Sequence, residues 1–142
     1  MKYTQESLAT WIDKLKVSFI ASVDEEGIPC MKAMLAPRKR EGLREFYFTT
    51  NTCSKRVAQY RQNPKASIYF YEKGRFKYQG LMLKGTMEVL EDDAIKQEIW
   101  RTGDTMYYHE GVTDPDYCVL HFTAHEGRLY SGLQHDSFVI QE

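Results

Sequence analysis

The most informative segment of the chain is Phe46-Tyr47-Phe48-Thr49-Thr50-Asn51-Thr52-Cys53-Ser54-Lys55-Arg56-Val57. It begins as an aromatic β-strand, passes through hydroxyl and amide side chains, and then enters a helix. The start of a helix exposes unpaired backbone N–H groups and the positive end of the helix dipole. Hydroxyls with Lys55 and Arg56 at that point predict an anion site, for which phosphate is the usual ligand. The alternative is that Thr52 or Ser54 only caps the helix while the cations face water.

Charge is distributed unevenly along the chain. Thirteen Lys or Arg and three Glu lie between Cys30 and Gly85, a net charge of +10, whereas the flanking segments together carry −11. This asymmetry indicates an anionic partner for the middle segment, or complementary charges that hold two parts of the chain or two subunits together. A nucleic-acid interface is not favoured, because the basic residues are spread over predicted turns and strands on several sides.

Length and composition predict one domain spanning residues 1–142. The chain is 42% hydrophobic with ten Tyr and seven Phe, which argues against disorder. No apolar run approaches the roughly 20 residues needed to span a membrane, and the polar N-terminus lacks a signal-peptide core. Three widely spaced cysteines without a CxxC motif favour a reducing, cytoplasmic location.

In and immediately after residues 46–57, we expect a strand over 45–50, a helix over 54–62 and a strand over 66–71. Upstream, apolar spacing predicts a helix over 4–16, and alternation predicts a hairpin of strands over 17–23 and 28–35. Residues 37–42 are predicted to form a turn. Downstream we expect a long strand over 76–90, a helix over 92–101, a loop over 103–116 and strands over 117–124 and 128–131. Gly80 and Gly85 inside the long strand predict bends or bulges.

These elements, six or seven hairpin-linked strands with three short helices, predict a mainly β fold that closes as a small antiparallel barrel. In their order and spacing the motifs resemble the pyridoxamine 5′-phosphate oxidase-like family of FMN-binding split barrels. A late Asp-Pro-Asp-Tyr segment at 114–117 resembles the general stress protein branch. The motifs are Gly27-x-Pro29-x-x-Lys32-x-Met34, the stretch from Phe48 to Arg56 followed by Asn63-Pro64-Lys65-Ala66-Ser67, and Leu83-x-Gly85-x-Met87-Glu88-Val89-Leu90.

The resemblance implies a six- to seven-stranded split β-barrel that forms a homodimer with FMN at the subunit interface. By position, 32–35 would run along the isoalloxazine and ribityl chain, 49–50 would hydrogen-bond the flavin or its phosphate, and 54–56 would hold the phosphate. Tyr130 stands where family members often carry Trp near the ring. The implied cofactor-binding residues are Lys32, Ala33, Met34, Leu35, Thr49, Thr50, Ser54, Lys55, Arg56, Gln79 and Tyr130.

The function that the resemblance implies is that of a flavin-dependent oxidoreductase with an unknown small-molecule substrate. The sequence identifies no catalytic acid, base or metal. Ser137 stands where true pyridoxamine phosphate oxidases carry a substrate-binding Arg, so that substrate is not expected. The alternatives are a non-enzymatic flavin or nucleotide carrier, a haem protein using one of the histidines, and a deazaflavin in place of FMN.

Other candidate residues have simpler interpretations. His121 and His125 lie four apart on a predicted strand, about 13 Å between Cα atoms, too far for one metal ion. Trp100, Tyr107 and Tyr108 are expected in core and interface packing, and the alternative is a lid or wall over the flavin from the partner subunit. Cys53 precedes a helix with cations nearby, which predicts a lowered thiol pKa and, as a minor hypothesis, a nucleophile.

Overall fold

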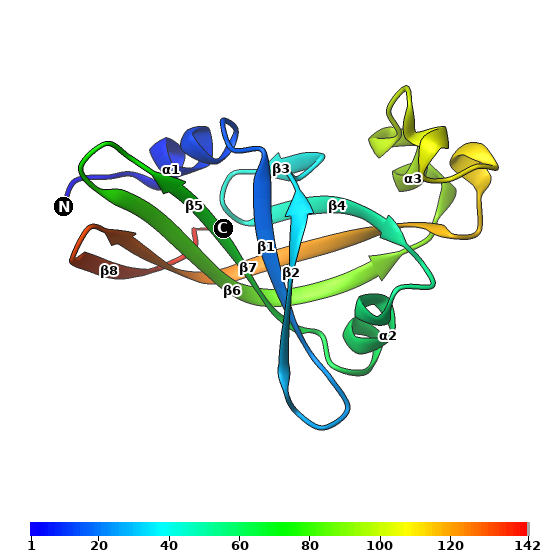
Figure 1. Cartoon of the computed structure of the whole chain (residues 1–142), viewed down its shortest axis with the longest axis horizontal. Helices are drawn as coiled ribbons and strands as arrows, with labels where there is room; N and C mark the ends of the chain where they lie inside the picture. Colours follow the sequence, from blue (N-terminus) through cyan, green and yellow to red (C-terminus); the bar gives the residue numbers. More distant parts are fainter. Residues whose placement is uncertain (142) are drawn as a thin grey trace.

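The computed structural model describes residues 1–141, which form one antiparallel sheet with helices at its margins (Figure 1). The sheet order is β2-β1-β5-β6-β7-β4-β3, and β8 pairs with β7. The described strands are β1 (Val17–Val23), β2 (Pro29–Leu35), β3 (Lys39–Glu41), β4 (Glu45–Asn51), β5 (Lys65–Lys73), β6 (Tyr78–Leu90), β7 (Tyr117–Ser131) and β8 (Gln134–Val139). The helices are α1 (Gln5–Ile12), α2 (Lys55–Gln62) and α3 (Asp93–Ile99), followed by the 3-10 turns η1 (Asp104–Met106) and η2 (Gly111–Thr113).

The long strand β7 organises the sheet. Its first half pairs with β4 and its second half with β8, while β6 runs along almost its whole length. The β6–β7 register shifts between Lys84 and Gly85, which confirms the predicted irregularity at Gly85. A Cβ on Gly85 would lie 1.9 Å from the backbone oxygen of Thr123, so only glycine permits this approach. The mainly β split-barrel class predicted from the sequence is confirmed.

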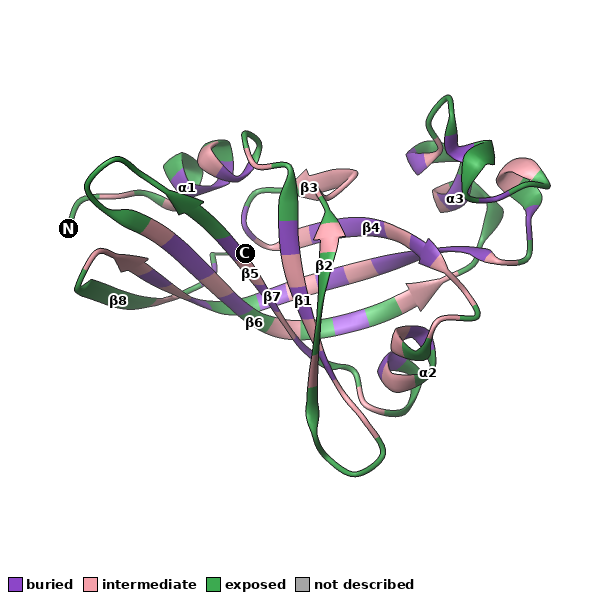
Figure 2. Ribbon diagram, in the orientation of Figure 1, coloured by how far each residue is buried: buried purple, intermediate pink, exposed green. Residues whose placement is uncertain are grey.

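The main core lies on the inner face of the sheet, and along β1 and the first half of β5 buried residues alternate with more exposed ones (Figure 2). Ile20, Phe46, Ile68, Leu81 and Phe122 are at most 1% exposed. Two helices add to the same cluster: α1 through its apolar stripe and α2 through Val57 and Tyr60. Such alternation is what a half-buried antiparallel sheet requires, because successive side chains point to opposite faces.

A second, smaller core forms where α3 and the two 3-10 turns fold back on β4 and β7. It contains Tyr47, Ile99, Tyr108, Tyr117 and Val119, with Trp100 packed against it. The hydroxyl of Tyr117 donates to the carbonyl of Lys96 at 2.7 Å. The packing interpretation is therefore confirmed for Trp100 and Tyr108, whereas Tyr107 remains 57% exposed.

Four sequence predictions about local structure were wrong. The turn predicted over 37–42 contains β3, and the strands predicted over 117–124 and 128–131 are one strand. The intervening Glu126 and Gly127 stay in the ladder because they pair with β8, which was not predicted. Helix α1 ends at Ile12 rather than at 16: the backbone N–H groups of Lys14 and Leu15 donate to the carbonyls of Trp11 and Ile12, three residues back, instead of continuing the α-helical pattern.

Among residues 1–141, no helix has both the length and the apolar character that crossing a membrane demands.

Candidate functional site

A hollow of about 270 Å³ opens between strand β2, the end of β4 and the start of α2. The strand β2 supplies one wall with residues 32–35, and β4 supplies the opposite wall. Arg56 closes one side from α2, and Tyr107 and Tyr108 reach in from the segment after α3. The lining residues are Lys32, Ala33, Met34, Leu35, Ala36, Arg38, Phe48, Thr49, Thr50, Asn51, Arg56, Tyr107 and Tyr108.

The start of α2 carries polar atoms without protein partners. Ser54 occupies the N-cap position but its side chain makes no capping hydrogen bond. The Oγ of Ser54 and the Nε of Arg56 are buried and unpaired within the described chain, while Arg56 Nη2 donates to Thr50 Oγ1 at 3.0 Å. Buried donors of this kind are rare without a ligand or water. A guanidinium edge, a free hydroxyl and a helix N-terminus fit a phosphate group.

The carboxylate of Asp116 lies beside the residues that immediately precede α2. Asp116 accepts from the side chain of Asn51 at 2.7 Å and from the backbone N–H of Cys53 at 2.9 Å. The hydrogen bond with Asp116 raises the pKa of the Cys53 thiol instead of lowering it. The expected activation of Cys53 was therefore wrong, because a carboxylate rather than the cations lies nearest the sulfur. Ser54 and Arg56, downstream of this contact, remain available.

An ion pair lies at the other end of the hollow. Arg38 and Asp104 form two hydrogen bonds of 2.8 Å, with side chains only 9% and 6% exposed. The hydrogen bond from Arg38 holds the pKa of Asp104 below its usual value, against the effect of burial. The same pair raises the pKa of Arg38. The pair joins the β2–β3 connection to the segment that carries Tyr107 and Tyr108.

The structure brings together most of the predicted site residues, but not all. Residues 32–35, Thr49, Thr50 and Arg56 line the hollow, and Ser54, whose hydroxyl is unpaired within the described chain, precedes Arg56 by two residues. Lys55 instead lines a separate hollow of about 500 Å³ beside the acidic turn at 24–26.

Gln79 and Tyr130 lie elsewhere in the same chain. Gln79 pairs with Ser131 in the ladder, and Tyr130 pairs with Gly80 on the outer face of the sheet, next to Tyr69. Neither residue lines the hollow between β2 and β4.

The sequence patterns do not identify Ala36, Arg38, Asn51 and Asp104 as contributors to the site. Asn51 lies in the polar run but has no predicted role. Arg38 lies in the predicted turn, and its partner Asp104 is 66 residues away. No local pattern links two charged residues at that separation, so only the folded chain reveals the pair.

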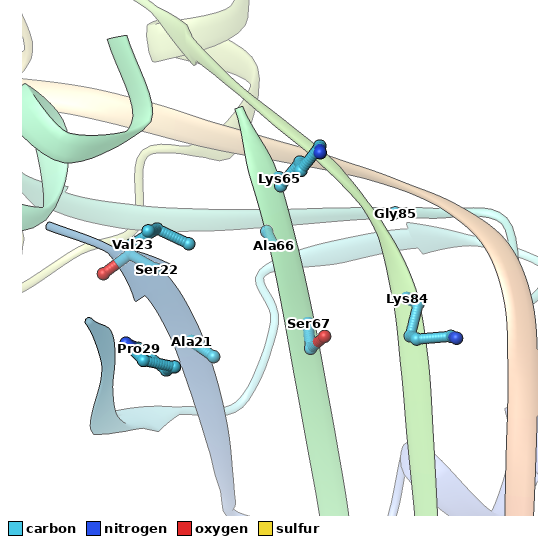
Figure 3. A pocket seen from close by; sticks show the side chains of 9 residues that line it. All are labelled: Ala21, Ser22, Val23, Pro29, Lys65, Ala66, Ser67, Lys84 and Gly85. Atoms are coloured by element: carbon cyan, nitrogen blue, oxygen red, sulfur yellow. The ribbon is translucent and has the colours of Figure 1, made fainter. Parts of the chain in front are cut away.

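A further hollow, of about 320 Å³, lies on the outer face of the sheet across β1, β5 and β6. Figure 3 shows its small side chains, such as Ala21 and Ser67, with Lys65 and Lys84 on β5 and β6. Lys84 pairs with Glu126.

Two of the histidines contact other side chains of the chain. His121 lies 2.9 Å from Glu45 and stacks on Tyr47, and His135 contacts Arg128. His121 and His125 both lie in β7, as the strand interpretation predicted. No cluster of His, Cys, Asp and Glu within the described chain could hold a metal ion.

The fold and the hollow define a split-barrel protein with an uncapped helix start beside a cleft. A family model described as pyridoxamine 5′-phosphate oxidase matches residues 4–131, and the chain belongs to this family. A search of curated proteins found no match.

Among solved structures, one relative is a Clostridium acetobutylicum protein related to general stress protein 26 of B. subtilis, of the pyridoxinephosphate oxidase family. It is 37% identical, with 97% of each chain covered and a TM-score of 0.83. General stress protein 26 from Bacillus anthracis is 16% identical, with 96% of this chain and 98% of that chain covered and a TM-score of 0.73.

A heme binding protein from Mycobacterium smegmatis shares the fold at 18% identity and a TM-score of 0.76. The match covers 98% of this chain and 59% of that one.

Proposed function

We propose that this protein binds FMN non-covalently in the hollow between β2, β4 and α2, and uses it as an oxidoreductase. The observation that carries the proposal is the pair of buried, unpaired donors, Ser54 Oγ and Arg56 Nε, at the start of α2. A dianionic phosphate group would satisfy both. Family membership adds independent support, since the fold is one that holds flavins.

The other lining residues have complementary tasks. The main chain of 32–35, with Phe48, offers a flat and largely apolar wall for a planar ring. Thr49 and Thr50 offer hydroxyl groups between the ring end and the phosphate end. Lys32 places a positive charge beside the wall, where it would favour negative charge on the ring. When bound, FMN supplies hydride or electron transfer, and the protein supplies position and electrostatics.

We further propose that two copies complete the site. A single chain offers about 270 Å³, slightly less than the roughly 300 Å³ at which ligand pockets begin. By register, one outer face of β1, β2, β5 and β6 carries exposed apolar side chains with no cover. They are Val17, Met31, Leu35, Tyr71 and Tyr78. A second copy packed on this face would bury them and bring Gln79 and Tyr130 near the pocket of its partner.

The first experiment is a visible spectrum of the purified protein before and after FMN addition, followed by fluorescence titration. We expect saturable binding, and Arg56→Ala should weaken it at least about tenfold, the effect of losing a charge-assisted contact. Lys55→Ala is the matched control, since Lys55 lines another hollow, and its effect should be smaller. Wild-type affinity in Arg56→Ala would refute the proposed phosphate position.

The competing functions give different readings in the same samples. NAD(P)H oxidation by FMN-loaded protein distinguishes an oxidoreductase from a carrier. A Soret band would identify haem, a possibility that the Mycobacterium smegmatis neighbour raises. None of the four histidines lines the hollow, which favours FMN over haem there.

A further inference from the structure

We propose that Tyr107 is a ligand-contacting wall of this pocket and that the Arg38–Asp104 pair is the device that positions it. This inference rests on the proposed FMN site and adds residues to which the sequence motifs assign no role. The ligand group that Tyr107 would contact is the planar ring system, not the phosphate.

The position of Arg38 along the pocket follows from strand β4. The backbone N–H of Arg38 donates to the carbonyl of Tyr47 at 2.7 Å, whereas Arg56 donates to the side chain of Thr50. Three residues along a strand span about 10 Å. Arg38 therefore marks the end of the hollow opposite Arg56. Tyr107 lines the hollow from the segment that Arg38 holds through Asp104, so a ligand with its phosphate at Arg56 would extend its ring toward that segment.

Asp104 fixes the segment through both its side chain and its backbone. Its carboxylate accepts two bonds from Arg38 and one from the backbone N–H of Arg101 at 2.8 Å. Its carbonyl accepts from the backbone N–H groups of Tyr107 and Tyr108, each at 2.9 Å. The carboxylate that binds Arg38 thus belongs to the residue that holds the peptide units of both tyrosines.

The two tyrosines have different environments. Tyr108 is 4% exposed and packs on Tyr117 with ring centroids 4.7 Å apart, which anchors the segment to the second core. Tyr107 lies next to it and lines the hollow, yet it is 57% exposed. An exposed aromatic ring on a fixed backbone loses little conformational entropy on binding, which suits a stacking contact.

The test measures both affinity and fluorescence of bound FMN. Excited flavin accepts an electron from a tyrosine in contact and then returns it, so a contacting tyrosine quenches the fluorescence without net chemistry. Tyr107→Phe should keep the affinity but lose this quenching. Tyr107→Ala should lose the quenching and weaken binding about fivefold, the value of one aromatic contact. Tyr3→Phe, at the contact between the N-terminal segment and β8, is the matched control and should match wild type in both.

The positioning role has its own variants. Arg38→Lys keeps the positive charge but loses the bidentate hydrogen bonding to Asp104. Asp104→Asn loses the negative charge. Each should raise the fluorescence of bound FMN as Tyr107→Phe does, while thermal unfolding reports whether the fold persists. If Asp104→Asn fails to fold, Arg38→Lys alone tests whether the ion pair positions Tyr107. The Tyr107 variants test whether the Tyr107 side chain contacts the ligand.

The outcomes separate the two proposals. Wild-type protein that binds FMN, with Tyr107 variants unchanged in fluorescence and affinity, overturns this inference and leaves the FMN site standing. Altered Tyr107 variants beside unaltered Arg38→Lys and Asp104→Asn overturn the positioning role alone. Wild-type protein that does not bind FMN overturns both proposals.

Discussion

Asp104 combines burial with a full set of charge-assisted bonds. Because Arg38 and the backbone N–H of Arg101 bind the ionised carboxylate, the pKa of Asp104 is lower in the folded chain than in the unfolded chain. Between those two values the unfolded chain binds more protons, so stability rises with pH. The contribution of Asp104 is therefore complete above the ordinary carboxyl pKa, about 4, and is lost as the pH falls through the lower folded value.

We expect Asp104→Asn to lower the free energy of unfolding by about 3–5 kcal/mol at pH 7, because it leaves Arg38 buried without a counter-charge. Urea unfolding of wild type and variant from pH 7 to pH 3 measures the difference. The gap between the two proteins should narrow on acidification. A gap that stays constant over this range would show that the carboxylate charge is not what stabilises the segment.

Gly85 and Gly80 both lie in β6, so an alanine substitution can be compared at two positions of one strand. A Cβ at either position would meet another atom at 1.9 Å, but that atom is backbone at Gly85 and the hydroxyl end of Tyr69 at Gly80. A tyrosine side chain can move, whereas a paired strand cannot. Gly85→Ala should cost about 3 kcal/mol, at the high end for overpacking, and Gly80→Ala clearly less. Equal shifts in thermal midpoint would contradict this explanation.

Among the helices, α1 and α2 begin in different ways. In α1, Thr4 Oγ1 accepts from the backbone N–H of Ser7, and Ser7 Oγ accepts from that of Thr4, a complete capping box. In α2, Ser54 has the cap position without the cap bond. A helix start whose cap residue leaves its hydroxyl unpaired is poorly optimised for stability and well suited to a ligand.

Thr4→Ala should therefore destabilise the protein by about 1 kcal/mol, the usual cost of losing a cap. Ser54→Ala should change stability by much less, because it removes a buried hydroxyl that has no partner. The same Ser54→Ala protein should bind FMN more weakly, whereas Thr4→Ala should bind it normally. Denaturant curves and FMN titrations on both variants check the contrast, and equal loss of stability would contradict it.

Over the entire chain, ion pairs between different segments account for much of the uneven charge distribution. At least five of the thirteen cations between Cys30 and Gly85 pair with acids outside that segment: Arg38 with Asp104, Lys39 with Glu98, Arg40 with Asp13, Arg61 with Glu91, and Lys84 with Glu126. Of the two explanations considered for the asymmetry, internal complementarity thus accounts for much of it. In the proposed FMN site, the phosphate contact is assigned to Arg56.

The exposed apolar outer face leads to a prediction about assembly. We expect sedimentation to give twice the mass of one chain. Met31→Glu with Tyr71→Glu should produce monomers, because both side chains are exposed on this face, at 73% and 44%. Leu133→Glu, in the β7–β8 turn, is the control and should leave the mass unchanged. A wild-type monomer, or a double variant that still dimerises, would remove the support for a shared site.

The strand and helix at 46–57, the β1–β2 hairpin and the mainly β class can be predicted from the sequence, because their signals are local: alternation, a helix start and turn residues. These local signals do not predict β3 or β8, which are strands only because β4 and β7 offer them open edges. Tertiary structure also decided which cation faces the hollow. Successive helix residues differ by about 100° in direction, so Arg56 lines the pocket and Lys55 another surface. It alone placed Asp104 against Arg38, because a buried charge selects its partner by proximity in space and not in sequence.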